Sequence, residues 1–145
     1  MMEQDGREGR ETGTSTMVET RTRRIVAVDD DERTLRMLVD ALGSPSQHVL
    51  TFDNGEIAIS YLAETTGCDL LILDVEMPGM DGFAVARAVR QLTHLDDMPI
   101  LALTGMTGPD DAVNILAAGA DAYRSKPVDI AALRSLVEDL LRDGR

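Results

Sequence analysis

The sequence is poor in the residues that stabilise secreted and membrane proteins. It has no tryptophan, aromatic residues make up 3% of its 145 positions, and its single cysteine, Cys68, cannot form a disulfide within the chain. No apolar run approaches the roughly 18–20 residues that cross a bilayer, and the first residues lack the apolar stretch of a signal peptide. We therefore expect a cytoplasmic protein with an aliphatic core.

Basic residues are also scarce. The formal net charge is −12, and residues 1–24 contribute nothing to it because five acidic and five basic side chains cancel there. The other residues carry the whole negative excess, which repels nucleic-acid phosphates and anionic membranes. We expect neither nucleic acid nor a membrane among the partners. One lysine, Lys126, is present, and every other cationic side chain is arginine or histidine.

Residues 1–23 differ from the rest of the chain in composition. They are rich in Gly, Thr, Glu and Arg and show neither helical nor strand periodicity, so we predict a disordered N-terminal tail. Residues 24–145 alternate short unbroken runs with segments whose apolar residues recur at helical spacing. We find no internal repeat in this region and predict a single domain.

Five strands and five helices are expected in residues 24–145. The predicted strands cover residues 25–28, 49–52, 70–73, 100–103 and 122–125. The apolar helix faces include Leu35, Leu38, Val39 and Leu42; Ile57 and Leu62; Val85 and Val89; Val113 and Leu116; and Leu133 and Val137. Unbroken apolar strands are typical of a parallel sheet covered on both faces, and each connection is long enough for a parallel crossover. The predicted fold class is α/β, a doubly wound (βα)5 domain, with Gly119 capping the fourth helix.

Polar residues follow four of the predicted strands. In chain order they are Asp29, Asp30 and Asp31, then Asp74, Thr104 and Lys126. The carboxyl ends of parallel strands share one edge of a sheet, where ligands bind in open α/β folds. Carboxylates, a hydroxyl and an ammonium group meeting there would suit a divalent cation and a phosphoryl group.

Several motifs at these positions resemble the receiver domain of bacterial two-component response regulators, over residues 25–141. The matching segments are Val28-Asp29-Asp30-Asp31, residues 73–82 from Leu73 to Gly82, Leu103-Thr104-Gly105, Gly119-Ala120-Asp121-Ala122-Tyr123 and Ser125-Lys126-Pro127-Val128. The resemblance implies a flavodoxin-like fold with strand order 2-1-3-4-5. It also implies that Lys126 and Pro127 are joined by a cis peptide bond. Gly105 departs from the family, in which alanine is usual at that position.

The resemblance assigns Asp74 as the phosphoacceptor and implies a Mg²⁺ or Mn²⁺ site. Asp30 and Asp74 would bind the metal directly, Asp29 mainly through water, and Glu76 through its backbone carbonyl. Hard cations of this kind take oxygen ligands. Two carboxylates 4 Å apart repel by about 4 kcal/mol at an effective dielectric of about 20, so without a cation at least one should have a raised pKa. Asp29 and Asp30 could instead cap the first helix, although Asp31 is better placed to do so.

Other residues have implied roles in switching and in the lifetime of the acyl phosphate. Lys126 would pair with Asp74 and then with a phosphoryl oxygen, while Thr104 and Tyr123 would shift on phosphorylation. Glu76 and Met106 would tune the rate of hydrolysis. The alternatives are a surface lysine, a threonine placed by strand propensity and an ordinary half-buried tyrosine ring.

These features predict phosphorelay signalling. A sensor histidine kinase or a histidine phosphotransfer protein would supply the phosphoryl group, and the face of helix 4, strand 5 and helix 5 would signal to a downstream protein. The domain would promote its own phosphorylation and dephosphorylation without being a turnover enzyme. The main alternative is a pseudo-receiver, a protein-interaction module that is not phosphorylated. A haloacid-dehalogenase-type hydrolase needs an Asp-x-Asp context, but here Glu76 lies two residues after Asp74 and Met77-Pro78 follows. In an FMN carrier the acidic run 29–31 would repel the phosphate of the cofactor.

Overall fold

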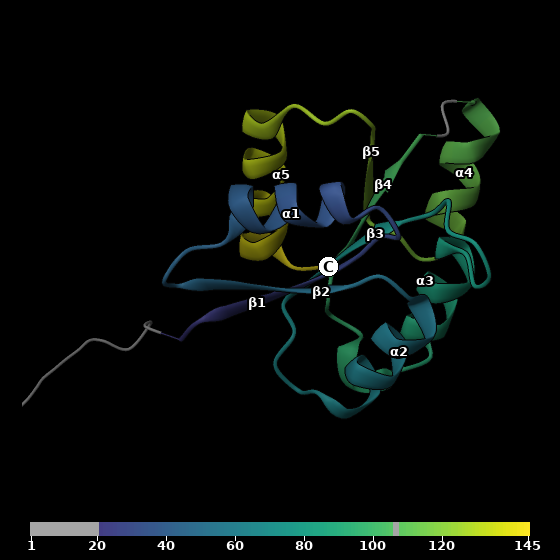
Figure 1. Ribbon diagram of the computed structural model, residues 1–145. Coiled ribbons are helices and arrows are strands. Elements are labelled where there is room, and N and C mark those ends of the chain that lie inside the picture. Colours follow the sequence, from purple (N-terminus) through teal and green to yellow (C-terminus); the bar gives the residue numbers. More distant parts are fainter. Residues whose placement is uncertain (1–20, 106–107) are drawn as a thin grey trace, which may run out of the picture.

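The computed structural model describes residues 21–105 and 108–145 and contains a five-stranded parallel sheet (Figure 1). The strands are β1 (Arg23–Val28), β2 (Gln47–Phe52), β3 (Leu70–Asp74), β4 (Ile100–Thr104) and β5 (Ala122–Ser125). Their order in the sheet is β2-β1-β3-β4-β5, which confirms the predicted flavodoxin-like arrangement. Most of the predicted tail lies outside the described residues, and β1 begins at Arg23.

The helices alternate with the strands along the chain. They are α1 (Glu32–Leu42), α2 (Gly55–Glu64), α3 (Gly82–Arg90), the 3-10 turn η2 (Thr93–Leu95), α4 (Pro109–Ala117) and α5 (Ile130–Asp143). In Figure 1, α1 and α5 lie on one side of the sheet, and α2, α3 and α4 lie on the other. No helix in residues 21–105 and 108–145 combines the length and apolarity needed to cross a membrane.

Each face of the sheet is covered by its own aliphatic layer. Leu38 of α1 and Leu133 of α5 pack against one face, while Leu62 of α2 and Val85 of α3 pack against the other. All residues of β3 and β4 are buried, as expected for central strands of a parallel sheet. Burying a large aliphatic side chain contributes about 1.5–3 kcal/mol, so these two strands form a rigid base for whatever follows their carboxyl ends.

Four large apolar side chains of the predicted helix faces are exposed. Val39 of α1 is 40% exposed, Ile57 of α2 is 58% exposed, and Val113 and Leu116 of α4 are 65% and 47% exposed. Helical periodicity could not predict this exposure, because it identifies an apolar stripe but not the width of the sheet beneath it. Val39 and Ile57 lie beside β2, where the sheet ends.

Short polar side chains fix where most helices begin. The Arg33 amide donates to Asp31 at 2.9 Å, so Asp31 caps α1, as the sequence predicts. Asp81 accepts from the Ala84 amide at the start of α3.

The C-terminal cap of α4 is Ala118, and Gly119 follows it with φ of 122°, a conformation that favours glycine. The prediction of Gly119 as the cap is therefore displaced by one residue.

Candidate functional site

The acidic residues predicted to act together meet at the carboxyl edge of the sheet. β1 and β3 are adjacent, and Val28 pairs with Leu73, so Asp29 and Asp74 follow aligned positions. Both side chains are buried, at 2% and 4% exposure, whereas Asp30 is exposed. One carboxylate oxygen from each of Asp29, Asp30 and Asp74 lies within 4.8 Å of the others.

Backbone amides of the flanking loops orient the two buried carboxylates. Asp29 Oδ1 accepts a hydrogen bond from the Asp31 amide at 2.8 Å, and Asp74 Oδ1 accepts one from the Glu76 amide at 3.0 Å. Within residues 21–105 and 108–145, Asp74 Oδ2 takes part in no hydrogen bond or ion pair. One oxygen of Asp74 is therefore fixed while the other has its lone pairs available.

Lys126 lies directly after β5 and places its ammonium group between the two buried carboxylates. Its Nζ is 2.8 Å from Asp29 Oδ2 and 3.6 Å from Asp74 Oδ1. Pairing with Asp74 was expected, and Lys126 does contact Asp74, but its shorter contact is with Asp29. The Lys126–Pro127 peptide bond is cis, the isomer that the resemblance implies.

Burial and charge perturb the pKa values of this cluster. Burial raises the pKa of Asp74 to about 6; the Glu76 amide opposes the rise, the charge of Asp29 adds to it, and Lys126 lowers it. Burial alone would lower the pKa of Lys126, but the hydrogen bond and charge of Asp29 outweigh burial and raise it. The raised pKa of Asp74 agrees with the expectation that one carboxylate resists ionisation when no cation is present.

The two predicted switch residues lie on β4 and β5. Thr104 ends β4, is fully buried, and pairs in register with Ser125. Its carbonyl accepts a hydrogen bond from the Lys126 amide at 2.8 Å. Tyr123 is half-buried and packs against the apolar layer beneath α2, α3 and α4. The movement of either side chain on phosphorylation stays a prediction.

Glu76 makes a contact that the sequence did not indicate. Its Oε1 accepts a hydrogen bond from the Gly105 amide at 2.9 Å, which joins the loop after β3 to the loop after β4. A Cβ at Gly105 would lie 2.8 Å from this oxygen, so glycine in place of the family's usual alanine permits the contact. The role of the Glu76 carbonyl as a metal ligand stays a prediction, and Met106 lies outside the described residues.

Gly82, the last residue of the motif 73–82, is a second positioning residue. A Cβ there would lie 2.4 Å from both the Asp74 carbonyl oxygen and Val75 Cα. The Gly82 amide donates to the Val75 carbonyl at 3.2 Å. Glycine therefore allows α3 to begin directly against the end of β3, and this packing fixes the backbone that carries Asp74.

Solved structures and curated proteins include relatives of this chain in fold and in sequence. The Vibrio cholerae chemotaxis protein CheY4 matches with a TM-score of 0.76 and 30% identity, over 81% of this chain and 98% of that one. The response regulator PleD of Caulobacter vibrioides is 34% identical over 119 residues, 82% of this chain and 26% of PleD. The signal transduction histidine-protein kinase BarA of Escherichia coli is 31% identical over 113 residues, 78% of this chain and 12% of BarA.

The fold and the strand-end site define an α/β domain of the receiver class. The response regulator receiver domain family matches residues 25–138, and this chain belongs to that family. Its homologues include both response regulators and histidine kinases of two-component systems. The chain spans about a quarter of PleD and about an eighth of BarA, so the similarity concerns the receiver domain alone.

The donor set of the acidic cluster fits a hard divalent cation. Three carboxylates contribute oxygen ligands at one edge, and Asp30 leaves the cluster open to solvent. Mg²⁺ usually takes one or two protein carboxylates and keeps several waters. A cation would also offset the repulsion among Asp29, Asp30 and Asp74, which the single ammonium of Lys126 only partly balances.

Proposed function

We propose that Asp74 accepts a phosphoryl group from a phosphohistidine of a sensor histidine kinase or a histidine phosphotransfer protein. The observation that supports this most strongly is the convergence of Asp29, Asp30, Asp74 and Lys126, four charged side chains from three separate strand ends. A carboxylate can act as a nucleophile toward phosphorus when the charge on the phosphoryl oxygens is neutralised.

In this mechanism an oxygen of Asp74 attacks the phosphorus in line with the histidine nitrogen. A P–O bond forms as the P–N bond breaks, and the imidazole nitrogen leaves with the electron pair and takes up a proton. Asp74 Oδ2 is the candidate nucleophile because the Glu76 amide occupies Oδ1. The ammonium of Lys126, 3.6 Å from Asp74 Oδ1, is close enough to move from Asp29 toward a phosphoryl oxygen.

The acidic residues would hold Mg²⁺ or Mn²⁺ for this reaction. Asp29, Asp30 and Asp74 would bind it, with the Glu76 carbonyl as a further ligand. When bound, the cation supplies positive charge to the phosphoryl oxygens and lowers the repulsion between the carboxylates. Asp29 and Asp74 are buried, and the cluster is open to solvent at Asp30.

The conformational switch would begin at the same strand ends. A new phosphoryl oxygen would accept a hydrogen bond from the Thr104 hydroxyl and draw the following loop toward Asp74, and Tyr123 would move inward. The face formed by α4, β5 and α5 would then change its affinity for a downstream protein. Such a change needs only a few kcal/mol of bias between two states.

Hydrolysis would return the domain to its starting state. Water would attack the phosphorus of the acyl phosphate, regenerate the Asp74 carboxylate and release inorganic phosphate. Glu76 and Met106 would tune this rate. The domain would thus work stoichiometrically, in the cytoplasm, and would not turn over an external substrate.

Intact-mass measurement after incubation with acetyl phosphate and Mg²⁺ tests this proposal. We expect one added phosphoryl group, which is absent in Asp74→Asn and in the presence of EDTA. A matched variant, Asp81→Asn, keeps the fold and should be labelled normally. If no donor labels the chain and Mg²⁺ also fails to bind, the pseudo-receiver alternative is correct. Steady release of phosphate from small esters would instead support a hydrolase.

A further inference from the structure

The open edge of the sheet at β2 carries backbone groups that no strand pairs with in the described part of the chain. β2 is the outermost strand, and β1 is its neighbour on one side. The amides of Arg23, in β1, and of Asp29, directly after it, donate to the carbonyls of Ser46 and Phe52. In a parallel ladder the alternate residues turn their backbone groups the other way, so those of Val49 and Thr51 face outward.

At the start of β2 the outward backbone groups are already hydrogen-bonded, whereas near its end, within the described residues, they are not. Ser44 and Gln47 exchange two backbone hydrogen bonds, at 2.9 and 3.2 Å, which use the outward groups of Gln47. Thr51, near the other end of β2, is exposed. An edge strand with free N–H and C=O groups is a template for a further strand, and here that template is confined to residues 49–51.

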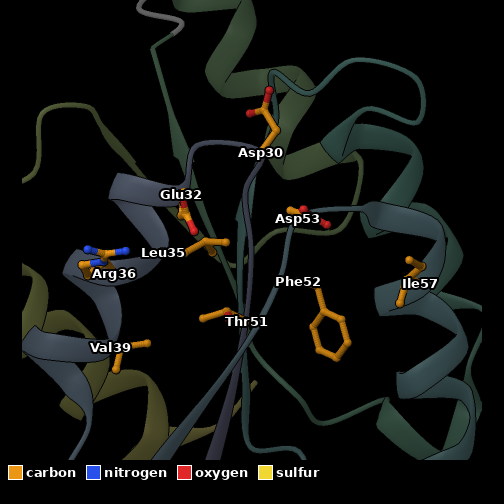
Figure 2. Close-up of a pocket in the computed structure, with 9 residues that line it drawn as sticks. All are labelled: Asp30, Glu32, Leu35, Arg36, Val39, Thr51, Phe52, Asp53 and Ile57. Atoms are coloured by element: carbon orange, nitrogen blue, oxygen red, sulfur yellow. The ribbon is translucent and has the colours of Figure 1, made fainter.

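A groove of about 770 Å³ surrounds the open end, within the range of about 300–1,000 Å³ that is usual for ligand sites. Figure 2 shows α1 with Leu35 and Val39 on one side, Ile57 of α2 on the other, and Thr51 and Phe52 of β2 between them. The ring of Phe52 is supported by Tyr61, with the ring centroids 5.4 Å apart. The groove therefore has an apolar wall on each face of the sheet.

The charges on the rim of the groove determine what can enter it. Asp30, Glu32 and Asp53 line it together with one cation, Arg36. The whole chain carries a net charge of −12, so an acidic segment, a nucleic acid or a second copy of this chain would be repelled. A basic ligand would be attracted to these carboxylates, of which Glu32 and Asp53 lie outside the cation site.

We propose that this groove binds an extended, basic segment of another protein by strand addition to β2. The segment would pair its backbone with Val49 and Thr51. Its alternate apolar side chains would contact Val39 on one face and Ile57 on the other, and a lysine or arginine would lie against Asp53. This recognition mode combines main-chain hydrogen bonds with pockets for alternate side chains. It does not depend on phosphorylation of Asp74.

The test is an NMR titration of residues 1–145, with ¹⁵N labelling, against a blocked hexapeptide of sequence Lys-Val-Thr-Val-Ile-Arg. We expect saturable shifts of the Val49 and Thr51 amides and binding that weakens with added salt. Thr51→Pro removes an outward donor at an edge position that tolerates proline, and should weaken binding at least about tenfold. Thr51→Val keeps the donor and should stay within about twofold of wild type.

The apolar walls and the rim have matched controls. Ile57→Asp should weaken binding at least about tenfold, while Val113→Asp, which adds the same charge at an exposed apolar position of α4, should leave it unchanged. Asp53→Asn should weaken it by about two- to fivefold. A peptide N-methylated at alternate residues should not bind, because it cannot pair with the edge.

Three outcomes would overturn the proposal. In the first, the peptide shifts amides elsewhere and not those of residues 49–51. In the second, these amides shift with protein concentration alone, so that a second copy occupies the groove. In the third, they respond to the peptide only after residues 1–20 are removed, so that the chain's own N-terminal segment occupies it.

Discussion

The two ends of the β-sheet hold their charged residues in opposite ways. At the amino end, the Arg90 guanidinium donates to the carbonyls of Met98 and Gly119 and to Asp121 Oδ2, at 2.8–3.1 Å. Asp121 Oδ2 also accepts from the Ile100 amide at 2.8 Å. The guanidinium thus ties α3 to the residues that precede β4 and β5, and each charge has several partners.

At the carboxyl end, the charges are unbalanced. Asp29, Asp30 and Asp74 share one ammonium, that of Lys126, and burial raises the pKa of Asp74 to about 6. A balanced network stabilises a fold, whereas an excess of buried negative charge costs stability until a cation binds. The comparison indicates that the amino end is built for stability and the carboxyl end for binding.

The largest expected effect is on the rate of phosphorylation, which should depend on Lys126 and not on Arg90. Lys126→Met should slow phosphorylation by acetyl phosphate on the order of 10²–10³-fold, because removing one preorganised charge from a reaction site has an effect of this size. Arg90→Met should leave the rate per folded molecule within about twofold. Time courses of intact mass, with far-UV circular dichroism to confirm folding, measure both. Equal losses in the two variants would break the comparison.

For the free energy of unfolding, we expect the larger effect from Arg90→Met. Arg90→Met leaves Asp121 without its main partner and two carbonyls without donors, so we expect a loss of about 3 kcal/mol in the free energy of unfolding. Urea denaturation at neutral pH measures this loss. The exposed pair of Arg142 and Asp139 is a control, and Arg142→Ala should leave the stability nearly unchanged.

A smaller effect of opposite sign is expected at Asp74. In EDTA at pH 7.5, Asp74→Asn should raise the free energy of unfolding by about 1–2 kcal/mol, because it removes a buried charge that repels Asp29. The pKa of Asp74 is about 6 in the folded state and 3.8 as its ordinary value. The folded wild type therefore binds a proton as pH falls through 6, and the advantage of the variant should shrink until about pH 4.

Urea denaturation of both proteins, repeated with Mg²⁺ in place of EDTA, gives a sharper test. The cation should stabilise the wild type, since it binds the folded state, and should stabilise Asp74→Asn less. A variant that is less stable than wild type in EDTA, or a gap between the two that widens as pH falls from 7 to 5, would contradict the assignment of unbalanced charge to this end of the sheet.

The smallest expected effect is on the free energy of unfolding, when Arg145 is removed from the network of Arg90 and Asp121. Arg145 donates to Asp121 Oδ1 at 3.0 Å, and its side chain is 40% exposed. Because Arg90 still neutralises Asp121, Arg145→Ala should cost only about 0.5 kcal/mol. Thermal denaturation at low and high salt would measure it. A loss near that of Arg90→Met would mean that the chain end carries a central part of the network.

Much of the carboxyl-edge site could be predicted from the sequence because it depends on local position. Asp29 and Lys126 directly follow strands, Asp74 is the last residue of one, and parallel strands bring their carboxyl ends together whatever the loops contain. The closer pairing of Lys126 with Asp29 could not be predicted. It depends on the spacing of strands that are far apart in the chain.

The contacts between neighbouring loops could not be predicted from the sequence either. The Glu76–Gly105 hydrogen bond joins residues 29 positions apart, and it exists because β3 and β4 are adjacent. Helical periodicity placed Val39 and Ile57 on apolar helix faces, but the sheet ends at β2 and leaves them lining a groove. Periodicity reports which residues share a face, and the breadth of the partner surface decides whether that face is covered.

The sequence by itself determined the alternation of strands and helices, the chemistry of the strand ends and the excess of negative charge. These properties follow from local patterns and composition. The tertiary structure alone decided the balance of charge at each end of the sheet and the open edge beside β2. Both are set by distances between atoms that the chain brings together only when it folds.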